Sequence, residues 1–135
     1  MLKDFVAENK RAKKDAIEKF LHANRNWDKQ LENVAVDIEY DPDGDYLWVQ
    51  IGEQGETIAA FTVDEGFVLL VDSNSYELRA VECPSFLEKA KKGWVKEGLW
   101  STLAEHIREG HHHIYILPER ERREVQQSLG ALVPA

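Results

Sequence analysis

The fold is decided by residues 34–51, which read VAVDIEYDPDGDYLWVQI. Apolar or aromatic residues occupy every second position from Val34 to Tyr40, and Asp37 and Glu39 fall between them. A period of two is typical of a strand with one buried and one water-facing side. The following DPDGD segment offers turn chemistry, because Pro fixes φ and Gly accepts a positive φ. We therefore expect a hairpin between strands 34–40 and 46–51.

Three further strands are expected, at 57–63, 67–72 and 76–82, because apolar runs alternate there with short turn segments. A parallel crossover needs a dozen or more residues, so loops of about three to five residues favour antiparallel pairing of neighbours in sequence. The run Phe67–Val71 is apolar at every position, which predicts a central strand covered on both faces. The strands from 34 to 82 are thus expected to form a five-stranded, mostly antiparallel meander.

Helical patterns flank this segment on both sides. Residues 3–25 lack Gly and Pro and carry apolar residues at helical spacing in their second half. After residue 84 the pattern predicts a short helix to about Lys92 and an amphipathic helix over 95–108 that ends at Gly110. A short strand is expected at 112–117, and Pro118 begins a polar terminal helix.

The fold class is therefore α+β, with the sheet packed by an N-terminal helix and C-terminal helices. A chain of 135 residues fits one domain. We divide residues 1–135 into an N-terminal helix and linker (1–33), the antiparallel sheet (34–83), and a helical region with a short strand (84–135).

The net charge of −8 is unevenly distributed. Residues 34–83 carry 12 Asp or Glu and one Arg, Arg79, whereas residues 1–33 carry 8 Lys or Arg against 6 acids, and residues 84–135 carry 8 against 7. Such a sheet cannot neutralise phosphates, which argues against a nucleic-acid partner. An acidic surface can steer a basic partner, and it can also serve solubility alone.

Other sequence features set the class of protein. No apolar run approaches the ~20 residues of a membrane span, and the N-terminus lacks the apolar stretch of a secretory signal, so we expect a soluble cytoplasmic protein without membrane contact. Cys83 is the single cysteine, which excludes an internal disulfide and multi-cysteine metal sites. Its place before Pro84, at a helix start, allows a nucleophile, but a buried cysteine at the sheet edge is the favoured interpretation.

The segment YDPDGDYL (40–47), followed by a second hairpin and the run Val68–Asp72, resembles the small bacterial domain of unknown function family numbered 2283. Members of that family typically open with a Tyr-Asp-Pro-x-x-Asp-x-Leu hairpin. The resemblance covers residues 34–83, and the last strand reads LRAVE (78–82) where the family has a Gly-Ile-Glu-Ile-Leu-like strand. It implies a compact antiparallel sheet and no particular activity. Small proteins of this kind sometimes look like partners of toxin-type proteins.

Two clusters of polar residues resemble ligand sets. Asp41, Asp43 and Asp45 have the spacing of the first calcium-loop ligands, but Tyr46 and Gly52 stand where a Gly and a bidentate Glu are needed. We interpret these aspartates as turn residues that are available to a partner.

The second cluster is formed by histidines. His111 and His113 would share one face of a strand, and His106 at the end of the preceding helix, with Glu105 or Glu109, would complete a three-ligand metal site. The spacing HxxxxHHH matches no established ligand pattern, and the helix dipole alone favours His at a helix C-terminus. A solvated histidine patch is therefore the favoured interpretation, and we expect no cofactor.

Aromatic residues suggest an interaction surface. Tyr46 and Trp48 lie on the strand face opposite Leu47 and Val49, where they form either an exposed patch or further core. No serine-hydrolase, dinucleotide or nucleotide motif is present. The favoured function is a non-enzymatic protein-interaction or regulatory module that forms a homo-oligomer or binds a protein partner through Tyr46, Trp48, Asp41, Asp43 and Asp45. The alternative is a metal-dependent enzyme that uses His106, His111 and His113.

Overall fold

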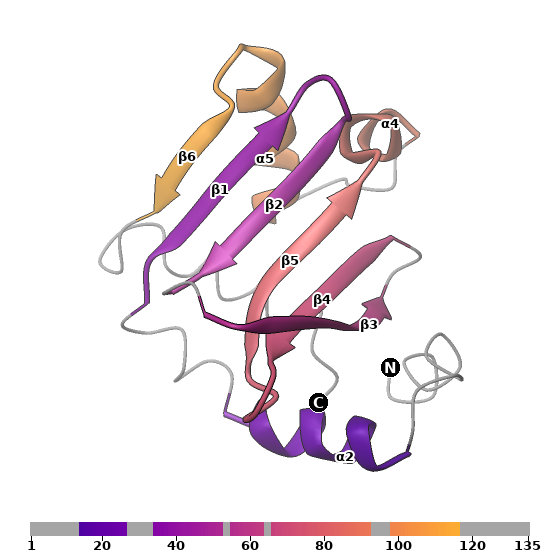
Figure 1. The fold of residues 1–135 in the computed structure, drawn as a ribbon. Coiled ribbons are helices and arrows are strands. Elements are labelled where there is room, and N and C mark those ends of the chain that lie inside the picture. The colour runs from indigo at the N-terminus through magenta and orange to yellow at the C-terminus, as the bar shows by residue number, and fades with distance from the viewer. Residues whose placement is uncertain (1–13, 27–33, 53–54, 64–65, 93–97, 117–135) are drawn as a thin grey trace.

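The computed structural model describes residues 14–26, 34–52, 55–63, 66–92 and 98–116 (Figure 1). Within these residues the elements are, in chain order, α2 (Lys14–Ala23), β1 (Val36–Asp41), β2 (Tyr46–Ile51), β3 (Thr57–Val63), β4 (Phe67–Asp72), β5 (Leu78–Pro84), α4 (Phe86–Lys91), α5 (Gly98–Arg108) and β6 (His113–Ile116). The α+β class and the antiparallel sheet are confirmed. Residues 3–13 of the predicted first helix and the terminal helix after Pro118 lie outside the described residues, and the first helix ends at Ala23, two residues earlier than predicted.

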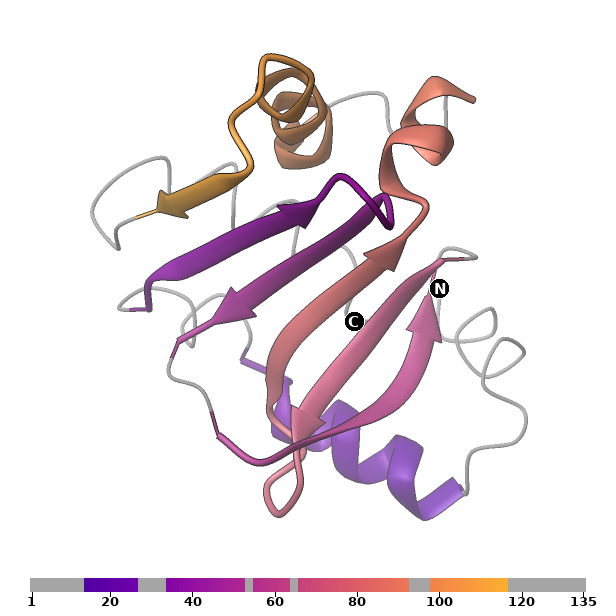
Figure 2. The ribbon, with the colours of Figure 1, turned by 45° about the horizontal axis from the view of Figure 1, so that its top comes forward.

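The sheet has six strands in the described chain, in the order β3-β4-β5-β2-β1-β6, and every neighbouring pair is antiparallel. The expected hairpins β1–β2 and β3–β4, and the β4–β5 pair, are present. The five-stranded meander is corrected in two respects, because β5 pairs with β2 where the meander places β3, and β6 adds to β1 as a sixth strand. In Figure 2, β3 lies at one edge of the sheet and β6 at the other.

The central position also differs from the prediction. β4 lies next to the edge strand β3, and the two middle strands are β5 and β2. Leu78, Ala80, Val81 and Cys83 of β5 are each at most 1% exposed, so this strand buries more of its length than the sequence pattern indicated. Burial of a short strand on both faces favours the middle of a sheet.

One face of the sheet forms the core. Its central row, which we call the core row, crosses all six strands in register and consists of Phe61, Leu69, Val81, Val49, Ile38 and Ile114. The first five of these side chains are buried and Ile114 is half-buried. Residues of α2, α4 and α5 join the same buried cluster, and α5 lies behind β1 and β2 while α2 runs along the lower end of the sheet (Figure 1).

Aromatic contacts and one buried amide attach the helices to this face. Phe20 of α2 contacts Phe61 with ring centroids 4.7 Å apart, and Phe67 contacts Trp100 of α5 at 4.6 Å. Asn24 is 2% exposed, yet its amide donates to the Tyr76 carbonyl and accepts from the Leu78 N–H, each at 2.9 Å. A buried amide with its hydrogen bonds satisfied locks the end of α2 to the β4–β5 hairpin.

The short helix α4 is capped by a residue distant in sequence. Ser85 precedes the helix in a left-handed conformation, with φ 55°, and makes no side-chain cap. The carboxylate of Asp45, in the β1–β2 hairpin, instead accepts hydrogen bonds from the N–H groups of Leu87 at 2.8 Å and Glu88 at 3.1 Å. This satisfies two of the donors that a helix N-terminus leaves unpaired.

None of the helices in the described part of the chain is long and apolar enough to cross a membrane.

Candidate functional site

The sheet face opposite the helices carries a second row of residues, which we call the open row. It crosses the same six strands in register and consists of Thr62, Val68, Glu82, Trp48, Glu39 and His113. Thr62, Glu39 and His113 are exposed, and the other three are half-buried. The neighbouring row of the same face is more buried, because Leu70, Ala80 and Gln50, which lie beside one another in register, are each at most 8% exposed.

Trp48 lies at the centre of the open row between two carboxylates. It faces Glu39 on β1 and Glu82 on β5. Two strand spacings separate the acidic residues, or about 10 Å. The indole Nε1–H donates to Gln50 Oε1 at 3.2 Å, and the Gln50 amide donates to the Arg79 carbonyl at 3.2 Å, so the ring is held on the sheet. The result is a fixed aromatic surface with a negative charge on each side.

Tyr46 adds a second aromatic residue beside Glu82. It is half-buried, and its phenol is hydrogen-bonded to the Glu82 carboxylate. Burial first, and that hydrogen bond second, hold the pKa of Tyr46 well above its usual value. The hydroxyl therefore stays a neutral donor and helps to orient the carboxylate that flanks Trp48.

The three predicted hairpin aspartates have different roles. Asp41 and Asp43 are exposed, and the Asp41 carboxylate accepts the Asp43 N–H at 3.0 Å. Asp45 also accepts a hydrogen bond from the Tyr40 hydroxyl at 2.8 Å, in addition to capping α4. Three hydrogen bonds occupy its carboxylate, so we leave Asp45 out of the candidate surface. No local pattern predicts this cap, because the helix whose N–H groups Asp45 accepts begins 41 residues later.

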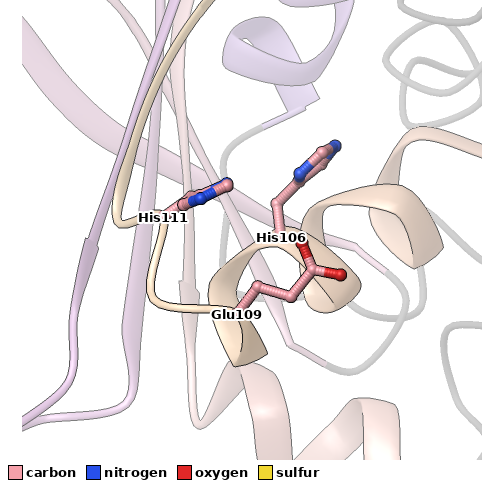
Figure 3. Close-up of side chains that lie close together, drawn as sticks. All are labelled: His106, Glu109 and His111. Atoms are coloured by element: carbon pink, nitrogen blue, oxygen red, sulfur yellow. The ribbon is translucent and has the colours of Figure 1, made fainter.

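The predicted histidine ligands separate into two clusters in the described chain. His113 lies on the open face with Asp37 and Glu39, and its Nε2 is 2.5 Å from Asp37 Oδ1. His106 and His111 group with Glu109 at the end of α5 (Figure 3). The spacing of the histidines along the sequence does not predict this division. The pairing of β6 with β1 determines which carboxylates lie next to His113.

The cluster at the end of α5 brings together two imidazoles and one carboxylate. The candidate ligand atoms of His106, Glu109 and His111 all lie within 4.8 Å of one another, and all three residues are exposed. The two imidazole rings are stacked with centroids 5.9 Å apart and an interplanar angle of 22°. This donor set is one that divalent transition ions bind.

His112, between the two clusters, belongs to neither. Its ring makes an edge contact with Tyr40 at 5.4 Å, and its carbonyl accepts the Tyr40 N–H at 2.8 Å. This residue therefore anchors the beginning of β6 to β1.

Cys83 is buried, as the favoured interpretation expected, but it lies on the middle strand β5 and not at the edge of the sheet. Burial raises the pKa of its thiol to about 11, and the nearby Asp45 carboxylate adds to the rise while Lys89 opposes it. Because the thiolate is the nucleophilic form, this thiol is poorly suited to covalent catalysis near neutral pH.

Comparisons of the chain with protein-family models, with curated proteins and with solved structures find no match. The resemblance to the domain of unknown function family 2283 therefore stays a hypothesis.

Proposed function

We propose that the protein is a non-enzymatic interaction module whose open sheet face binds a Lys- and Arg-rich protein segment. The observation that carries the proposal is the register of Trp48 between Glu39 and Glu82. An ammonium or guanidinium group above the indole would meet the ring face and both carboxylates together.

The charges around this central position favour the same kind of ligand. By register, Asp37, Glu39, Asp41 and Glu82 belong to the open face. Arg79, the cation of the central segment, pairs with Glu77 at 3.1 Å. The same acidic groups disfavour a nucleic acid, whose phosphates need cations.

The segment that we propose as the occupant is residues 10–14 of a second copy of the chain. These residues read KRAKK and place four cations in five positions. They complement a sheet segment, 34–83, in which acids outnumber Lys and Arg by 12 to one. The proposed assembly is therefore a homo-oligomer held by the basic segment of one copy and the open face of another.

The energies of the individual contacts determine the affinity and the salt dependence that we expect for this binding. An exposed ion pair contributes about 0.2–1 kcal/mol. A cation over an aromatic ring contributes about 0.5–2 kcal/mol. The interaction should therefore be weak for an isolated segment and sensitive to salt, since the screening length falls from ~10 Å at 0.1 M to ~3 Å at 1 M.

The test measures binding of a labelled peptide with the sequence of residues 7–16 to the full chain by fluorescence anisotropy, at low and high salt. The Glu39→Gln/Glu82→Gln variant should lose binding. The control variant Glu56→Gln/Glu105→Gln removes the same number of charges from exposed positions outside the open row and should retain it. Equal losses in both variants would show that only net charge matters and would overturn the proposal.

Sedimentation at low salt tests whether residues 10–14 of a second copy bind the open face. We expect the wild-type chain to associate, and a variant with Lys10, Arg11, Lys13 and Lys14 all changed to Gln to remain monomeric while it still binds the labelled peptide. A monomeric wild type that also fails to bind the peptide, or a variant that associates as before, contradicts the assignment of the basic segment.

A further inference from the structure

We propose that His106, Glu109 and His111 form a binding site for a divalent late first-row transition ion, with Zn²⁺ as the reference ion. The site lies at the end of α5, in the connection to β6 (Figure 3). It shares no residue with the open row, so it stands or falls independently of the proposed function.

The backbone holds the three residues in a closed turn. The Glu109 N–H donates to the Glu105 carbonyl at 3.1 Å, the Gly110 N–H to the Ile107 carbonyl at 3.0 Å, and the His111 N–H to the His106 carbonyl at 2.9 Å. Gly110 has a φ of 94°, a conformation that residues with a Cβ rarely adopt. This turn reverses the chain and places His111 beside the helical turn that carries His106.

Both sides of the turn are anchored in the core. Ile107, next to His106, is 4% exposed, and Ile114, three residues after His111, belongs to the core row. The edge contact of His112 with Tyr40 fixes the intervening residue. The backbone of the site is thus determined by packing before any ion binds, which lowers the ordering cost of binding.

The donors suit a transition ion better than a hard cation. Two imidazoles and a carboxylate are ligands that Zn²⁺ uses in proteins, whereas Mg²⁺ and Ca²⁺ prefer sites made of oxygen atoms. Tetrahedral ligands about 2.0–2.1 Å from Zn²⁺ lie about 3.4 Å apart. The present separations, within 4.8 Å, reach that value by rotation of exposed side chains. Three protein ligands leave one tetrahedral position to water.

The neighbouring group of Asp37, Glu39 and His113 is the weaker candidate. His113 Nε2 already lies 2.5 Å from Asp37 Oδ1, so an ion would have to displace this contact. Its donors are two carboxylates and one imidazole, a harder set. It therefore serves as the internal control for the proposed site.

Calorimetric titration with ZnCl₂ tests the proposal on the full chain, purified without metal-affinity resin and treated with a chelator. We expect one high-affinity ion per chain and no comparable heat with MgCl₂. His106→Ala and His111→Ala should each weaken Zn²⁺ binding by about a hundredfold or more, because loss of a direct ligand costs at least as much as the roughly 10–100-fold lost with an outer-shell partner. Glu109→Gln should weaken it in the same direction.

Two matched histidine variants define the outcomes. His22→Ala on α2 and His113→Ala on β6 also remove exposed imidazoles, and both should leave Zn²⁺ affinity unchanged. The proposal is overturned if wild type binds no ion, if His106→Ala and His111→Ala retain wild-type affinity, or if His113→Ala removes binding. Circular dichroism of each variant verifies that the fold is intact, and the exposure of all four histidines makes this the expected result.

Discussion

The core row and the open row lie on opposite faces of the sheet, and on each strand their members are adjacent residues. The two rows nevertheless differ strongly in chemistry. The core row places branched and aromatic side chains against α2 and α5, and five of its six members are buried. The open row replaces them with acidic residues around one tryptophan, and its exposed members are Thr62, Glu39 and His113.

Because the two rows differ in burial, we expect the core row to stabilise the fold and the open row to bind a partner. Burial of one large apolar side chain stabilises a fold by about 1.5–3 kcal/mol, whereas an exposed carboxylate contributes little. Changes in the core row should therefore affect unfolding, and changes in the open row should affect binding. Equal effects of changes in the two rows on unfolding and on binding would contradict this distinction.

The largest effect is expected from Leu69→Ala in the core row. Leu69 is fully buried, so its truncation should cost about 2–5 kcal/mol in the free energy of unfolding. The adjacent Val68, on the open face, is half-buried, and Val68→Ala should cost about 1 kcal/mol or less. Urea unfolding of both variants measures the contrast, and similar losses would show that Val68 is packed as tightly as Leu69.

Asp45→Ala should have the next largest effect, because its carboxylate caps α4 and binds the Tyr40 hydroxyl. The combined loss should be about 2 kcal/mol of unfolding free energy. Asp45→Asn keeps an acceptor oxygen and tolerates the φ of 49° at this position, so it should recover part of the loss. The control is Asp43→Ala in the same hairpin, which should stay within about 0.5 kcal/mol of wild type. Thermal or urea unfolding measures whether Asp45 and Asp43 contribute differently to the free energy of unfolding.

Trp48→Leu should weaken binding of the residue 7–16 peptide about tenfold, or about 1.4 kcal/mol, because the cation loses its aromatic partner. Trp48→Phe keeps an aromatic face and gives up only the hydrogen bond to Gln50, so its affinity should lie between those of Trp48→Leu and wild type. Anisotropy at low salt measures both. Equal affinity of Trp48→Leu and wild type would exclude the indole from the interface.

The smallest effect is expected at Asp72, the last residue of β4. Backbone hydrogen bonds from Ser75 and Asn74 hold the pKa of Asp72 below the usual value of an aspartate. A lowered folded-state pKa stabilises the fold above the unfolded-state value, and this contribution is lost as the pH falls through the folded-state value. Asp72→Asn should therefore be slightly less stable than wild type at neutral pH, and the difference should shrink and disappear as the pH falls through the lowered folded-state pKa of Asp72. Unfolding measured across the acid range tests this, and a difference that grows toward low pH contradicts it.

Local sequence patterns were sufficient for the strands and their faces. Alternation placed Ile38 and Val49 on one side and Glu39 and Trp48 on the other, and both pairs lie opposite each other in the structure. This works because successive side chains of a strand must point to opposite faces. Turn chemistry identified the β1–β2 hairpin for an equally local reason.

The order of the strands was decided by contacts between distant parts of the chain. Short loops indicated that β3 follows β2 in space, but β5 takes that position and β6 pairs with β1. Loop length excludes some strand pairings, but it does not determine which of the remaining pairings forms. The choice depends on which strand buries most apolar surface in the middle of the sheet, and that is settled only when the whole core packs.

The sequence by itself determined the α+β class, the period-two faces, the acidic character of segment 34–83 and the presence of histidines between α5 and β6. Only the tertiary structure decided that Trp48 lies between Glu39 and Glu82, that Asp45 caps α4, and that His106 joins His111 and Glu109 while His113 does not. Composition and periodicity follow from neighbouring residues, whereas these side-chain groupings depend on the register between strands and on helix packing, which long-range burial sets.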